Sequence, residues 1–163
     1  MFGSKRKKAV KHAVGLVRPL IDLFHEHYGS PAGFWQNEYV LGYVGFLLVF
    51  HINHTSGINL SVTDKGFALS EAFEALSNLN GAEITRNYTA LAEQDSGGFK
   101  LASDRAAVVA LYVVGQLKNE DEIPEVVEAK TVADFAGMTD DRSAIAGHMF
   151  KNLFADIVVK QLS

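Results

Sequence analysis

Histidine is the residue type in this chain best suited to catalysis or metal binding, because the sequence contains no cysteine. His51 and His54 are three residues apart at the end of a predicted helix, a spacing typical of ligands for zinc, nickel or iron. A short turn joins this helix to the preceding one, so antiparallel packing should place His12 beside them. These three histidines are therefore candidate ligands of a divalent metal, and a metal-dependent enzyme is one hypothesis. Histidines that bind the carbonyl groups at helix ends are the alternative interpretation.

The other common catalytic signatures are absent from the sequence. It has no glycine-rich phosphate-binding loop, no nucleophile elbow, no HExxH motif and no EF-hand loop. Glu26 and Glu38 flank a predicted turn and could form an acid–base pair, but Glu26 lies between two histidines that point to different helix faces. That pattern is typical of a solvated helix end. We therefore favour a non-enzymatic function, and no cofactor other than a metal ion is indicated.

The elements that position these residues are predicted to be helices. Apolar residues recur every three or four positions over residues 5–28, where Pro19 should bend or split the helix. Gly29 ends this helix, and the next is predicted to begin at Pro31 and to span about 32–53. From Tyr39 onward it has no polar face, so it must be covered on all sides.

The rest of the chain also has helical periodicity. Residues 54–62 are predicted to form a loop, with a short strand at 58–62 as the alternative. The helices expected after this loop are one capped by Thr63 or Asp64 and ending at Asn80-Gly81, then 82–94, 103–117, 124–137 and 139–162. The helix at 103–117 is almost entirely apolar and should be a second central helix. The sequence thus predicts an all-α, single-domain bundle of six or seven helices over residues 1–163, with a frayed basic N-terminus at 1–8.

The helix at 32–53 carries the candidate interface or ligand-pocket residues. They are aromatic residues and two glycines: Trp35, Tyr39, Gly42, Tyr43, Gly45, Phe46 and Phe50. A ridge of this kind is typical of a core, and aromatic residues are also enriched at interfaces. The glycines indicate either a close helix crossing or space for a hydrophobic small molecule between the two central helices. The apolar helix faces exceed what a small bundle usually covers, which favours a homo-oligomer, most simply a homodimer.

Charge and hydropathy restrict the location and the partners. The net charge is −4, and a basic cluster at 5–11 contrasts with an acidic stretch at 120–128. The basic cluster could contact an anionic membrane surface weakly, whereas a nucleic-acid-binding domain carries a basic face over its whole surface, so we do not expect nucleic acid. The apolar run at 39–52 is shorter than the ~20 residues of a membrane span, and the basic N-terminus lacks a signal-peptide apolar region. We expect a cytoplasmic protein that acts through self-association or partner binding.

Overall fold

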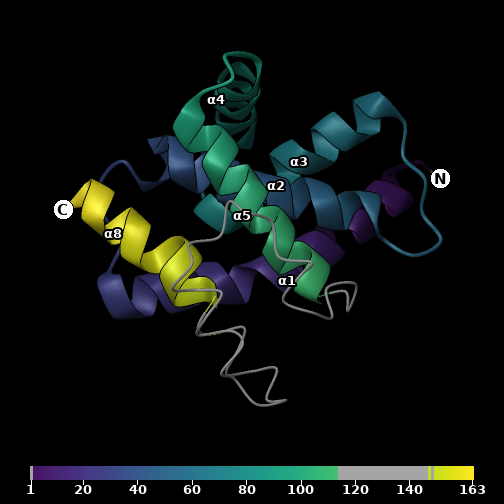
Figure 1. The fold of residues 1–163 in the computed structure, drawn as a ribbon. Coiled ribbons are helices and arrows are strands. Elements are labelled where there is room, and N and C mark those ends of the chain that lie inside the picture. The colour runs from purple at the N-terminus through teal and green to yellow at the C-terminus, as the bar shows by residue number, and fades with distance from the viewer. Residues whose placement is uncertain (1, 114–146, 148) are drawn as a thin grey trace.

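The computed structural model describes residues 2–113, 147 and 149–163. Their regular structure is entirely helical, with no strand in the described ranges, and the predicted all-α bundle is confirmed (Figure 1). The elements are α1 (Phe2–Tyr28), η1 (Phe34–Gln36), α2 (Glu38–Asn53), α3 (Val62–Ser77), α4 (Gly81–Glu93), α5 (Gly97–Val113), the π-helical turn η3 (Lys151–Ala155) and α8 (Asp156–Leu162). The helix predicted at 124–137, the start of that at 139–162 and the end of that at 103–117 lie outside the described residues.

Helix α2 is the centre of the bundle. It packs against α1, α3, α4 and α5, and Figure 1 shows α5 crossing in front of it with α1 below and α3 above. Every residue from Tyr39 to Leu48 is buried except Phe46, which is half-buried. The prediction that this helix is covered on all sides therefore holds from Tyr39 to Leu48 apart from Phe46, and Val49 and Phe50 near its end are half-buried.

The start of α2 differs from the prediction of a helix from about residue 32. Gly33 has a φ of 79°, a left-handed conformation that interrupts a helix, and Phe34–Gln36 form only the short turn η1. The Asn37 side chain then accepts hydrogen bonds from the backbone N–H groups of Tyr39 and Val40 at 2.9 and 3.0 Å. This capping begins α2 at Glu38, because it satisfies N–H groups that have no partner within the helix.

Two further helix starts also differ from the sequence prediction. The cap of α3 is Ser61, whose hydroxyl accepts from the backbone N–H of Asp64 at 3.1 Å, and the expected loop before it contains no strand. Helix α5 begins at Gly97, six residues before the predicted Ser103, because the glycine pair expected to break the chain forms its first turn. A Cβ atom at Gly98 would meet the end of the flexible Glu38 side chain, so the first turn of α5 lies beside the start of α2.

Helix α1 is continuous through Pro19, so of the two predicted outcomes, a bend or a split, the split does not occur. Pro19 and Gly15 are both exposed, so water can bind the Gly15 carbonyl group that the proline leaves without its helical donor. The basic N-terminus expected to fray is part of the same helix. Arg6 pairs with Glu71 of α3 at 2.9 Å, which ties the first turns of α1 to the bundle.

Candidate ligand-binding site

The structure brings two of the three predicted metal-ligand histidines together. Antiparallel packing of α1 and α2 places the rings of His12 and His51 edge to face, with 6.1 Å between their centroids. His51 is only 4% exposed, and burial is the main reason why its pKa falls from 6.5 to about 4, with His12 and His54 adding to the effect. The imidazole of His51 is thus neutral at pH 7.

His54 interacts with the end of its own helix. Its Nδ1 donates to the Phe50 carbonyl oxygen at 2.7 Å, and its ring stacks on the Phe50 ring with 4.1 Å between centroids. This is the helix-end interaction that the sequence offered as the alternative to metal binding. No group of three or more histidine or acidic side chains arranged to hold a metal ion occurs within the described ranges.

The predicted ligand space between the two central helices is filled at both glycines of α2. A Cβ atom added at Gly42 would lie 2.5 Å from the Phe99 carbonyl oxygen and 3.0 Å from the Ala102 Cβ. One added at Gly45 would collide with the Tyr88 ring. Gly42 therefore lies at a close crossing of α2 and α5, whereas the space at Gly45 is filled by the Tyr88 ring of α4.

The aromatic residues of α2 mostly face the chain's own core. Tyr39 and Tyr43 are 1% and 0% exposed, whereas Phe46 and Phe50 are half-buried. The Tyr39 hydroxyl donates to the Leu153 carbonyl oxygen at 2.6 Å and accepts from Arg105 Nη1 at 3.1 Å. Tyr39 and Tyr43 therefore offer no surface to a partner in this arrangement.

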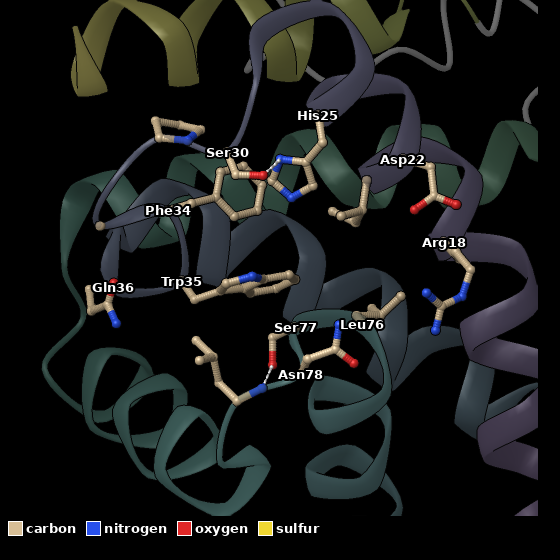
Figure 2. Close-up of a pocket in the computed structure, with 14 residues that line it drawn as sticks. Arg18, Asp22, His25, Ser30, Phe34, Trp35, Gln36, Leu76, Ser77 and Asn78 are labelled. Atoms are coloured by element: carbon tan, nitrogen blue, oxygen red, sulfur yellow. Dashed lines mark hydrogen bonds between the residues drawn. The ribbon is translucent and has the colours of Figure 1, made fainter.

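A pocket lies between the second half of α1, η1 and the turn that joins α3 to α4 (Figure 2). Its volume is about 400 Å³, within the range of about 300–1,000 Å³ typical of small-molecule sites. Its floor is apolar and buried, and consists of Ile21, Phe34, Trp35 and Leu76. Its rim is polar, and includes Arg18, Asp22, His25, Ser30, Gln36, Ser77 and Asn78. Because the floor residues are nearly buried, the surface that this pocket exposes is more polar than apolar.

Three rim residues come from one face of α1. Arg18, Asp22 and His25 are four and three residues apart, which aligns them along the helix. Arg18 Nη2 donates to the Ala75 carbonyl oxygen at 2.6 Å, which fixes the guanidinium group against the end of α3. His25 Nδ1 donates to the Gly29 carbonyl oxygen at 2.8 Å, which holds the imidazole against the turn after α1.

Trp35 forms the aromatic part of the floor. Its ring contacts Phe34 and Phe73 edge to face, with centroid separations of 5.1 and 6.2 Å. These contacts fix the indole, which is 7% exposed, and no hydrogen bond within the described part of the chain engages its Nε1. Trp35 is thus a fixed aromatic group of which only a small part reaches the pocket.

Of the ten candidate residues predicted from the sequence, only Trp35 lines this pocket. Arg18 and Asp22 are not among the residues predicted from the sequence, although polar residues at positions 18, 22 and 25 are a detectable signal of one polar helix face. Ser77 and Asn78 had no such signal, because only tertiary packing brings the end of α3 to α1.

Comparisons with known proteins find no match for this chain among protein-family models, curated proteins or solved structures. Within the described ranges, no helix has both the length and the apolar character needed to cross a membrane.

Proposed function

We propose that this protein binds a small molecule in the pocket formed by α1, η1 and the α3–α4 turn. The observation that carries the proposal is the open volume of about 400 Å³ above a buried apolar floor. The packing around α2 is closer. Its glycines Gly42 and Gly45 are in direct contact with residues of the neighbouring helices. An unfilled space beside fixed aromatic and polar groups is therefore a feature that a bound ligand would complete.

Native mass spectrometry of the freshly purified protein tests this proposal, because a tightly held ligand should remain bound. Gln36→Phe places a bulky ring at one end of the pocket, and Gln94→Phe, on an exposed position that does not line the pocket, is the matched control. We expect a bound mass in the native protein and in the control, and its loss in Gln36→Phe.

A ligand that is lost during purification is detected by fluorescence. Trp35 is the single tryptophan of the chain, so its emission reports directly on the pocket floor. We expect at least one compound in a panel of small metabolites to change this emission in the native protein and the control but not in Gln36→Phe. The proposal would be overturned if native mass spectrometry showed only the mass of the unliganded chain and no compound in the panel changed the Trp35 emission.

Self-association, the function that the sequence favours, remains a prediction, as do the homodimer and the cytoplasmic location. It would have to use surfaces other than Tyr39 and Tyr43, since both are buried within one chain. Light scattering at low protein concentration measures it independently of the pocket.

A further inference from the structure

The pocket has two opposite charges at one end. Arg18 and Asp22 lie four residues apart on α1, and Figure 2 shows them together across the pocket from Gln36, with the Trp35 ring between. Opposite charges at this spacing commonly pair with each other. Here neither side chain forms an ion pair with any residue in the described part of the chain.

The guanidinium group of Arg18 is held in place while most of its donors stay available. One N–H is used by the Ala75 carbonyl oxygen, and a guanidinium carries five donors in a fixed plane. A group that is already oriented loses little side-chain freedom when it binds an anion, and the planar donors match a carboxylate well. Arg18 is therefore suited to hold a carboxylate at this end of the pocket.

Asp22 restricts the ligand further. A purely anionic ligand at Arg18 would bring a second negative charge close to the Asp22 carboxylate, and a purely cationic ligand at Asp22 would meet Arg18. A ligand that carries a positive and a negative group on the same carbon atom would satisfy both side chains. The apolar floor then accommodates an uncharged body attached to that head group.

We propose that the pocket takes a hydrophobic α-amino acid, whose carboxylate pairs with Arg18, whose ammonium group pairs with Asp22 and whose side chain packs on Trp35. This inference rests on the proposed function, and it assigns the chemical class of the ligand. The size of the pocket suits a leucine- or phenylalanine-sized molecule better than a nucleotide, because about 400 Å³ is near the lower limit for ligand sites.

Three related compounds distinguish the role of each charge. Phenylalanine carries both charges, phenethylamine lacks the carboxylate and hydrocinnamate lacks the ammonium group. Titration of the full chain with each, followed by Trp35 fluorescence and calorimetry, should give phenylalanine a Kd about tenfold or more below both analogues, as expected when one charged hydrogen-bonding partner is removed.

Two variants assign the charges to residues. Asp22→Asn should bind phenylalanine and hydrocinnamate about equally, and Glu26→Gln, on an exposed carboxylate that does not line the pocket, should retain the native preference. Arg18→Gln should bind phenylalanine and phenethylamine about equally, with Arg86→Gln as its exposed control. The Asp22 variant remains informative if loss of the Arg18 bond to α3 disturbs folding, because no hydrogen bond or ion pair in the described part of the chain uses the Asp22 side chain.

The outcomes separate this inference from the proposed function. Equal affinity for the three compounds, or preferences unchanged in both variants, would overturn the assignment of a zwitterion. If another compound still binds natively and its binding is lost in Gln36→Phe, the proposed function stands while the ligand class is wrong. If the purified native protein carries no bound mass and no compound binds it, both are overturned.

Discussion

The contact between α2 and α5 and the pocket beside η1 are built from similar residue types but differ in how space is filled. At the first, a Cβ atom at Gly42 would press against the Phe99 backbone, and polar groups such as Tyr39 and Arg105 bond to each other. At the second, a comparable set of aromatic and polar side chains surrounds about 400 Å³ of open space. The first region is a completed core, and the second has room for another molecule.

This difference follows from the path of the backbone. Two regular helices can approach closely wherever small residues face each other, and Gly42 and Ala102 provide such a pair. Between α1 and α2 the chain is irregular, since Gly29 and Gly33 both have positive φ angles. This irregular segment does not pack along α1 or α3 as a regular helix would, and the pocket is the space that remains where the end of α3 meets α1.

The largest effect that distinguishes the two regions is expected at Tyr43. Tyr43→Ala removes a fully buried ring that contacts Phe154 with 4.8 Å between centroids, so the free energy of unfolding should fall by about 3–5 kcal/mol. Denaturant unfolding measures this loss. Gln36→Phe at the pocket should change the stability by less than about 1 kcal/mol, because it fills space that is already open.

Tyr43→Phe is the control for this prediction. The Tyr43 hydroxyl is buried without a hydrogen-bond partner in the described part of the chain, and burial raises its pKa above the ordinary value. Removal of an unpaired polar group should leave the stability unchanged or raise it by about 1 kcal/mol. A marked loss in Tyr43→Phe would mean that the hydroxyl has a partner and that this core is less complete than its packing indicates.

The sequence predicted those features that depend on local pattern. The coverage of α2 follows from its lack of a polar face, and the contact between His12 and His51 follows from the short antiparallel connection. The start of α2 was not predictable in this way, since it depends on the conformation of Gly33 and the cap at Asn37. The pocket was not predictable either, because Asn78 reaches α1 only after the helices have packed.

Because His51 is buried at the α1–α2 contact, we expect the free energy of unfolding to depend on pH. Its pKa is about 4 in the folded chain and near 6.5 when unfolded, so between these values the unfolded chain binds a proton that the folded chain does not. The stability should therefore fall as the pH drops from 6.5 toward 4, by about 1 to 3 kcal/mol, and this contribution should be constant above pH 6.5.

Unfolding of His51→Phe across this pH range isolates the contribution. The variant should lose this part of the slope, because phenylalanine retains a buried ring and does not titrate. His27→Phe, on an exposed histidine near the end of α1, is the control and should keep the native slope. Parallel pH profiles for the native chain and His51→Phe would contradict the assignment.

The smallest of these effects compares two glycines within helices. Gly42→Ala places a Cβ atom against the Phe99 backbone, which cannot rotate away, so α5 must shift and the stability should fall by about 1–3 kcal/mol despite the gain in helix propensity. Gly15→Ala on the exposed face of α1 meets nothing within 4 Å and should raise the stability by about 0.5–1 kcal/mol. Thermal or denaturant unfolding measures whether each substitution lowers or raises the stability. Stabilisation by both substitutions would mean that the α2–α5 contact has space to spare, and the contrast with the pocket would then be one of degree.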